Sequence, residues 1–561
     1  MTLRWRTFGV ALVFVTVMMA AAWSSWLPPY YLENDDVSIR MALEGRTVPG
    51  AVPTGFALWP NAALGWFVVL IERVLPSIPW WDVLLAGALL WALGVLLALV
   101  WDALGSGWLA RTTAVSAVVL AMAPLVASFQ FTISATLAGG AAALLAVTEV
   151  SAARPRRAVL ILATLLFVAG LLIRPMGASA GAMVAAILSL PFVRTRRRWV
   201  AHILGIVAAV GVFFLAAQYV DVALYGTSDE WDKYLRYNLI GGPLVDWGSD
   251  LSTKYAREIG QSVGWSANDW LMLERALGVD PIIHGFDRVN QAYQTQAAMA
   301  SRLGVLSLMF ARATSYSVAS LRNVLSTSAL VAITGGLLVA AYGTRRTVAE
   351  AVAVVLLFWA ICAAIDVTFE RLPWRLLGPL QVIFVAATVI TIGAARRIAS
   401  PLLGIIALGA ILVMIAPILT AQAREAGGRV GRSQEIDGEL RMVQRLSPSL
   451  VIFYGSRFPR EHWWRPFHRP PAVELPSVTL GWNNQNPQVQ HFLADTGRQP
   501  LLRALCRDPS ILIVADRDPL DLVTTYMHEH FDTAVHWTQV YEGSFPAWRC
   551  SAINGHPSEK P

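Results

Sequence analysis

The sequence predicts an α-helical polytopic membrane protein with about eleven transmembrane helices and an extracytoplasmic α/β domain at its C-terminal end. Hydrophobic residues make up 56% of the 561 residues and only 14% are charged, whereas a soluble domain carries about 25% charged residues. Apolar runs long enough to cross a bilayer recur up to about residue 420. Beyond this point the chain becomes polar, with short apolar runs that are typical of buried strands.

Runs of about 17–25 apolar residues cross the hydrocarbon core of a bilayer as helices. The first run follows MTLRWR and ends in small residues, so a cleaved secretory signal is its alternative interpretation. Cleavage there would not change which side of the membrane the later segments face. The predicted spans are residues 8–26, 82–101, 112–128, 131–151, 157–173, 176–193, 199–220, 323–342, 348–366, 374–395 and 400–420.

Short arginine clusters between these runs indicate the orientation, because cytoplasmic loops are enriched in arginine and lysine. All clusters fall on one side if the N-terminus is cytoplasmic. We therefore expect a multi-pass protein of the cell membrane. Its transmembrane domain, residues 1–420, carries outer loops at 27–81 and 221–322, and residues 421–561 form an outer domain. The clusters are Arg4 with Arg6, Arg111, Arg154 with Arg156 and Arg157, Arg194 with Arg196 to Arg198, Arg345 with Arg346, and Arg396 with Arg397.

The same clusters explain the formal net charge of +7. They are separated by apolar runs and form no basic stripe or nucleic-acid-binding motif. The sequence therefore excludes nucleic acid as the partner and leaves membrane lipid.

Residues 60–75 (PNAALGWFVVLIERVL) are also apolar, but a span here would move every later arginine cluster to the outer face. The run is short and carries Glu72 and Arg73 near its end. We therefore expect a helix that lies along the outer surface of the membrane, beside tryptophans such as Trp59 that suit the headgroup layer.

The tail has the pattern of a small α/β domain. SLVIFYG (449–455) and SILIVAD (510–516) predict buried strands bounded by turn residues. Residues 518–531 predict a helix and 533–541 a further strand. A polar linker, AREAGGRVGRSQ (423–434), is expected to precede the domain.

Two features of the tail leave alternatives open. Cys506 and Cys550 lie where oxidation is permitted, so they can form a disulfide, but spacing alone does not establish proximity. Cys362 falls inside a predicted span and is expected to be a packing residue. HEH at 528–530 lacks the HExxH spacing that places two histidines on one helical face, so we expect a solvated helix end rather than a metal site.

The stretch YYLENDDVSIR concentrates carboxylates where the chain leaves the first span. One interpretation is a solvated loop that caps a helix beginning at Val37. The other is a site near the lipid surface, because a carboxylate there can act as a general base or, with a neighbour, hold Mg²⁺ or Mn²⁺. We take Asp35 and Asp36 as candidate catalytic residues, and Glu33 and Asn34 as candidate substrate-binding residues.

Chemistry on a lipid-linked phosphate also requires cations at the outer face. Arg174 lies between two predicted spans, and Arg371 and Arg375 lie at the junction of two others. Arginine binds phosphate oxygens through paired hydrogen bonds. The alternative for Arg371 is an ion pair with Glu370 or Asp366.

The second outer loop adds candidates for binding a sugar. EWDKYLRYNLIGGPLVDW alternates aromatic and charged residues around Lys233 and Asn238, and Asp269 follows in GWSANDWLM. Trp231 and Tyr234 could pack against a sugar ring. The alternative interpretation is that the aromatic residues anchor the loop at the membrane surface and that Asp269 caps a helix.

This layout resembles the GT-C superfamily of membrane glycosyltransferases, which includes protein O-mannosyltransferases and lipid A aminoarabinose transferases. The likeness is carried by the acidic first outer loop, the large second outer loop and the outer tail. The sequence resembles most closely uncharacterised bacterial membrane proteins that share the NDD segment and a following stretch, here GAVPTGFALWPN (50–61). The likeness to the superfamily implies a polyprenyl-phosphate-sugar donor, an inverting transfer to a cell-envelope glycan, lipid or protein, and catalytic roles for Asp35 and Asp36. Because ENDD is not a DxD sequence, a metal requirement stays open.

A transporter or flippase of lipid-linked saccharides is the alternative from another functional class. It predicts functional charges in the middle of spans and broken helices in a repeat. In this sequence the spans are largely free of charge and the carboxylates crowd one face.

Overall fold

The structure, a computed structural model, divides the chain into two compact units, each composed of three segments. The first unit comprises Met1–Asp36, Trp59–Asp221 and Arg312–Arg429, and the second comprises Val37–Leu58, Val222–Ala311 and Val430–Pro561. The residues that the structure describes are 4–104, 107–152, 154–189, 196–242, 244, 249–275, 277–303, 345–369, 373–393, 401–454, 458–471, 473 and 475–553.

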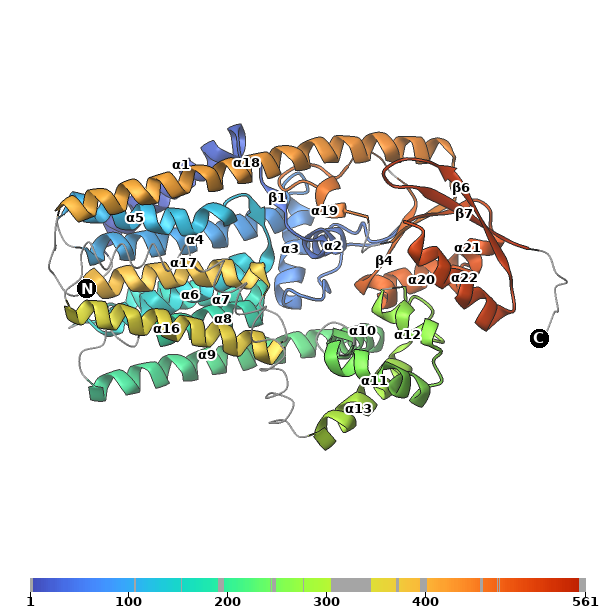
Figure 1. Cartoon of the computed structure of the whole chain (residues 1–561), viewed down its shortest axis with the longest axis horizontal. Helices are drawn as coiled ribbons and strands as arrows, with labels where there is room; N and C mark the ends of the chain where they lie inside the picture. Colours follow the sequence, from blue (N-terminus) through green and yellow to red (C-terminus); the bar gives the residue numbers. More distant parts are fainter. Residues whose placement is uncertain are drawn as a thin grey trace. The chain divides into compact units, whose positions relative to one another are not determined.

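Long apolar helices dominate the first unit (Figure 1). Among the described residues, seven helices are long and apolar enough to cross a membrane, and α7, α8 and part of α16 are shorter apolar helices. The helices and 3₁₀ turn that lie in or begin in this unit are α1 (Trp5–Ser25), α2 (Asn34–Leu43), α3 (Ala62–Val74), α4 (Trp80–Ala103), α5 (Trp108–Met122), η1 (Ala123–Leu125), α6 (Phe131–Val150), α7 (Arg157–Ile173), α8 (Pro175–Leu188), α9 (Arg196–Tyr225), α16 (Arg345–Phe369), α17 (Trp374–Gly393) and α18 (Pro401–Arg445).

Every predicted span except 323–342 coincides with one of these helices, and residues 323–342 lie outside the described part of the chain. The predicted helix at 60–75 is also present as α3, capped at its start by Asn61. The chain is therefore a helical membrane protein with many apolar helices. The total of eleven spans and the surface position of α3 stay predictions.

A two-residue parallel pair brings the acidic segment to the start of α6. In it, β1 (Tyr30–Tyr31) pairs with β2 (Ser128–Phe129). The register continues past the strand, because the Leu32 N–H donates to the Phe129 carbonyl at 3.0 Å. The residues that follow Leu32 therefore lie beside the N-terminus of α6.

The helix that was expected to begin at Val37 begins at Asn34, so this prediction was wrong by one helical turn. Asp35 and Asp36 occupy its first turn. Carboxylates are stabilised there by the positive end of the helix dipole. The acidic residues are therefore part of a helix and not of a loop before it.

Helices α6 and α8 approach each other so closely that glycine is required at two positions. A Cβ atom on Gly139 would lie 2.0 Å from the Ala178 carbonyl oxygen, and one on Gly181 would lie 2.1 Å from that of Thr136. Small residues permit such backbone contacts between membrane helices. The contacts fix the starts of the two helices, Phe131 and Pro175, with respect to each other.

The second unit is built around a five-stranded sheet with the strand order β4-β3-β5-β7-β6. Strands β3, β4 and β5 are parallel, whereas β7 runs antiparallel to β5 and β6. The elements of this unit are α10 (Asp229–Gly241), α11 (Ser249–Ser262), α12 (Ala267–Glu274), α13 (Phe286–Leu303), β3 (Leu450–Tyr454), α19 (Arg460–Trp463), β4 (Ser477–Leu480), η4 (Trp482–Gln485), α20 (Pro487–Asp495), α21 (Leu501–Arg507), β5 (Ile511–Val514), α22 (Asp518–Phe531), β6 (Val535–Tyr541) and β7 (Ala547–Ala552).

The sheet is buried on both faces, which explains why its central strands are continuous apolar runs. In β3, Ile452 packs into one hydrophobic cluster and its neighbours Val451 and Phe453 into another. The first cluster contains residues of α10 to α13, and the second contains residues near the end of α18. The second outer loop and the tail therefore share a hydrophobic core.

The predicted linker at 423–434 is wrong, because these residues form part of the continuous helix α18. Most residues of AREAGGRVGRSQ favour helix, and this preference outweighs its three glycines. The predicted strands at 449–455, 510–516 and 533–541 and the helix at 518–531 are confirmed within a few residues by β3, β5, β6 and α22. The packing units also interleave along the chain, unlike the predicted division at residue 420.

A disulfide joins Cys506 to Cys550, with Cα atoms 4.5 Å apart. It links α21 to β7. Both cysteines are buried in the cluster shared with α10 to α13. Cys362 is a free, buried cysteine, as expected.

We expect the double substitution Cys506→Ser and Cys550→Ser to destabilise the second unit by about 4 kcal/mol, because the bond closes a loop of 44 positions. Thermal unfolding of the protein in detergent checks this. Reductant should lower the Tm of the native chain and of Cys362→Ala, but not that of the double variant. An equal effect of reductant on all three would contradict the prediction.

Candidate functional site

The acidic residues predicted from the sequence converge with two arginines in the first unit. Asp35 and Asp36 come from the first turn of α2, and Glu33 directly precedes that helix. Arg375 lies in the first turn of α17. Arg174 lies at the break between α7 and α8. We call these five residues the acid–arginine cluster.

Asp36 is fully buried and is held by the start of α6. Its Oδ1 accepts a hydrogen bond from the Phe131 N–H at 2.9 Å. This N–H belongs to the first turn of α6, where the helix dipole attracts a negative charge. Among the described residues, Oδ2 of Asp36 has no hydrogen-bond partner. One oxygen is therefore fixed and the other can still accept or carry a proton.

Burial raises the pKa of the Asp36 carboxyl well above its ordinary value of 3.8. The nearby carboxylates of Asp35 and Asp82 raise this pKa further, while the hydrogen bond from Phe131 opposes the rise. The protonated form of Asp36 is thus favoured to a higher pH than that of an exposed aspartate.

Arg375 lies against two of the carboxylates. Its Nη1 forms an ion pair with Glu33 and lies 3.7 Å from Oδ2 of Asp35. The side chain of Asp35 is 24% exposed, whereas Asp36 is 0% exposed. Asp35 therefore combines an ion pair with access from outside the protein, which Asp36 lacks.

Arg174 lies close enough to Asp35 to feel its charge. Its guanidinium lies over the rings of Trp59 and Phe131, at 4.6 and 5.4 Å from their centroids. Burial lowers the pKa of Arg174 to about 10, and the negative charge of Asp35 opposes this shift. Arg174 therefore stays positively charged at neutral pH.

The sequence prediction missed Asp82, which lies in the first turn of α4 and is fully buried. Its Oδ1 accepts a hydrogen bond of 2.5 Å from the Tyr31 hydroxyl. Arg429 was missed as well, because it falls in the segment interpreted as a linker. It donates to the Tyr31 carbonyl at 2.8 Å and lies over the Tyr30 ring. A lone aspartate at the start of an apolar run was the signal that could have identified Asp82.

The other predicted site residues have different positions. Lys233 is exposed on α10, and the buried Asn238 donates to the Tyr234 carbonyl at 2.9 Å. Asp269 forms a capping box with Ser266 at the start of α12, which confirms its predicted cap. These three residues belong to the second unit. Arg371 lies outside the described residues.

The carboxylates of the cluster offer oxygen atoms of the kind that Mg²⁺ and Mn²⁺ prefer as ligands. Within the described residues, the group of three with ligand atoms close enough to share a metal ion is Asp269, Glu529 and His530. Glu33 and Asp35 lie against Arg375 instead. Two of the carboxylates of the acid–arginine cluster are thus paired with a guanidinium group, and a divalent cation there stays a prediction.

No protein-family model matches the chain, and no curated protein matches it. Among solved structures, the chain is similar to ArnT from Cupriavidus metallidurans in the apo state, with a TM-score of 0.39 and 12% identity over 96% of this chain and 97% of that chain. ArnT from the same organism bound to undecaprenyl phosphate is similar with a TM-score of 0.35 and 13% identity over the same shares. At these low TM-scores the likeness carries no argument about the family or the reaction of this chain.

We expect Asp36→Asn to change how stability depends on pH. Above its ordinary pKa of 3.8, the native carboxyl keeps a proton that the unfolded chain releases. The native protein therefore loses stability as pH rises through this window. The asparagine variant should gain Tm relative to the native chain as pH rises from about 4 to about 8. Thermal unfolding in detergent over this range checks the prediction.

Asp495→Asn is the matched control, because Asp495 is exposed at the end of α20. It should follow the native pH profile. Parallel profiles for Asp36→Asn and the native chain would contradict the expected proton uptake.

Proposed function

We propose that the chain is a membrane glycosyltransferase that transfers a sugar from a polyprenyl-phosphate donor to an extracytoplasmic glycan, lipid or protein. The observation that carries this proposal is the acid–arginine cluster. It combines carboxylates that can take a proton with guanidinium groups that can bind a phosphate. The guanidinium groups stand at the ends of apolar helices, and Asp36 is hydrogen-bonded to the start of α6.

Asp35 is the general base in this proposal. It is the partly exposed aspartate of the cluster, so an acceptor hydroxyl can reach its oxygen. Asp36 is a positioning residue, because it is enclosed and joins α2 to the start of α6 through Phe131. Its raised pKa also reduces repulsion with Asp35, since a protonated carboxyl carries no charge.

Arg375 and Arg174 bind the donor phosphate in this proposal. Arg375 now pairs with Glu33 and Asp35, and a phosphate can take over one of these ion pairs. Arg174 has its guanidinium against two aromatic rings, and its position is therefore fixed before a donor binds. Arginine suits this role because it binds phosphate oxygens in pairs and remains charged when buried.

The reaction is then a direct displacement at the anomeric carbon. The acceptor oxygen attacks as Asp35 takes its proton, and the polyprenyl phosphate leaves on the opposite face of the sugar. Positive charge develops on the sugar ring in the transition state, as in glycoside hydrolysis. Displacement from one face inverts the anomeric configuration. A divalent cation, Mg²⁺ or Mn²⁺, stays a prediction that the assay below tests.

The charges at the opposite ends of the helices support an extracytoplasmic site. Helix α6 begins at Phe131 beside the cluster and ends near Glu149, which is paired with Arg156 at 2.8 Å. The Arg4 backbone N–H bonds to Asp102, at the other end of α4 from Asp82. Basic residues thus gather away from the cluster, and the positive-inside rule assigns them to the cytoplasm.

Transfer from radiolabelled polyprenyl-phosphate sugars by the purified protein tests the proposal. Asp35→Asn should lower the rate by about 10²–10⁴-fold, because it removes the base. Arg375→Gln should raise the KM for the donor. Asp495→Asn, the exposed control, should keep native activity. A chelator arm reports whether a divalent cation is required.

Native rates in Asp35→Asn would refute its role as the base. If no donor is used but labelled lipid-linked saccharide crosses a reconstituted bilayer, the chain is a transporter. In the described helices, buried charges such as Asp82 and Glu149 lie near helix ends. This distribution favours the transferase.

A further inference from the structure

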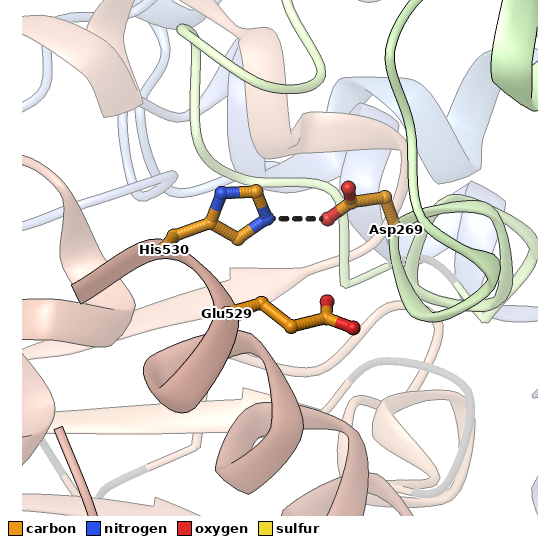
Figure 2. Close-up of side chains that lie close together, drawn as sticks. All are labelled: Asp269, Glu529 and His530. Carbon is orange, nitrogen blue, oxygen red and sulfur yellow. Dashed lines mark hydrogen bonds and ion pairs between the residues drawn. The ribbon is translucent and has the colours of Figure 1, made fainter. Parts of the chain in front are cut away.

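The second unit holds a separate group of metal-ligating side chains. Asp269, Glu529 and His530 each offer a ligand atom, and these atoms all lie within 4.8 Å of one another (Figure 2). Asp269 comes from α12 in the second outer loop, whereas the other two come from α22 in the tail. Asp269 and His530 are 261 positions apart. The group is therefore a product of the fold and not of a local motif.

One residue, Ser266, orients both carboxylates. Its backbone N–H donates to Oδ2 of Asp269 at 3.0 Å, and its hydroxyl donates to Oε2 of Glu529 at 2.8 Å. Each carboxylate thus has one oxygen held by Ser266, while Oδ1 of Asp269 lies 2.8 Å from Nε2 of His530. Hydrogen bonds of this kind fix metal ligands in position and raise their affinity.

The two helices that carry the group are fixed by packing. Trp270 and Leu273 of α12 lie in the same hydrophobic cluster as Val523 and Tyr526 of α22. The amide of Asn268 adds a hydrogen bond of 3.1 Å to the Leu522 carbonyl. Side chains on packed helices keep their separation, which a metal site requires.

The charges around the group favour a cation. Asp269 is 1% exposed and Asp280 is 3% exposed. Asp280 accepts a hydrogen bond from the buried Tyr526 hydroxyl. In the described part of the chain, neither these aspartates nor Glu529 has a lysine or arginine nitrogen within 4.0 Å, and His530 is the partner of Asp269 at 2.8 Å. Buried carboxylates are stabilised by an opposite charge, which an ion can supply.

We propose that Asp269, Glu529 and His530 bind a divalent transition-metal ion of the zinc type, which joins α12 to α22. One imidazole and two carboxylates are suitable zinc ligands. Ligand atoms in a tetrahedral zinc site lie about 3.4 Å apart, so small side-chain rotations suffice. To bind the metal through Nε2, the neutral ring of His530 would carry its proton on Nδ1, and the metal would replace the contact between Nε2 and Asp269. Water fills the fourth position, because Glu529 is exposed.

The full-length protein in detergent, freed of metal by chelator, tests this proposal by calorimetric titration with Zn²⁺. We expect a site whose affinity falls by about tenfold or more in His530→Gln and Glu529→Gln. His528→Gln is the matched control, because His528 is an exposed histidine on the same helix. It should bind Zn²⁺ like the native chain. Zn²⁺ should also raise the Tm of the native chain and of the control.

Co²⁺ serves as a coloured probe of the geometry and should give the intense absorption of a four-coordinate site. Absence of Zn²⁺ binding, or equal affinity in all four proteins, would show that Asp269 and His530 form only an ion pair. If His530→Gln does not fold, Glu529→Gln decides the question, because Glu529 is exposed. None of these readouts uses sugar transfer, so they are independent of the proposed reaction.

Discussion

The hydrogen bond from the Phe131 N–H to Asp36 is the interaction on which the arrangement of the acid–arginine cluster depends. It joins the first turn of α2 to the first turn of α6 and buries a carboxylate where the helix dipole offsets part of the desolvation. The β1–β2 pair sets the register that makes this bond. Asp35 lies in the same helical turn as Asp36, but its side chain is partly exposed and lies beside Arg375.

Most of the fold could be predicted from hydropathy, because long apolar helices are one of the few structures that can span a bilayer. The strands of the tail were predictable for a related reason, since burial on both faces produces continuous apolar runs such as LVIFY in β3. The errors arose where local composition misled. Three glycines and the polar composition suggested a linker in residues that continue α18. The residues expected to cap a helix at Val37 form the first turn of that helix. The sharing of a core between α10–α13 and the sheet depends on contacts that no local pattern encodes.

The candidate site was predictable where unusual residues stand in an apolar chain. Three carboxylates and an arginine stood out against their surroundings, and Glu33, Asp35, Asp36 and Arg375 do lie together. Asp82 and Arg429 were missed because each lay in a segment already interpreted as a span or a linker. The group of Asp269, Glu529 and His530 could not be predicted from the sequence, for a different reason. HEH has the wrong spacing for a local metal motif, and its third ligand, Asp269, comes from a distant segment.

The positions of the charged residues in the acid–arginine cluster depend on the contact between the apolar helices α6 and α8. Gly139 and Gly181 carry no functional group, yet neither position has room for a methyl group. A larger residue at either position would push the helices apart. Arg174, at the start of α8, would then move away from Asp35. Inactivating mutations in this chain should therefore include substitutions of glycine within apolar helices. A genetic screen would score these two glycines as essential although they take no part in the reaction.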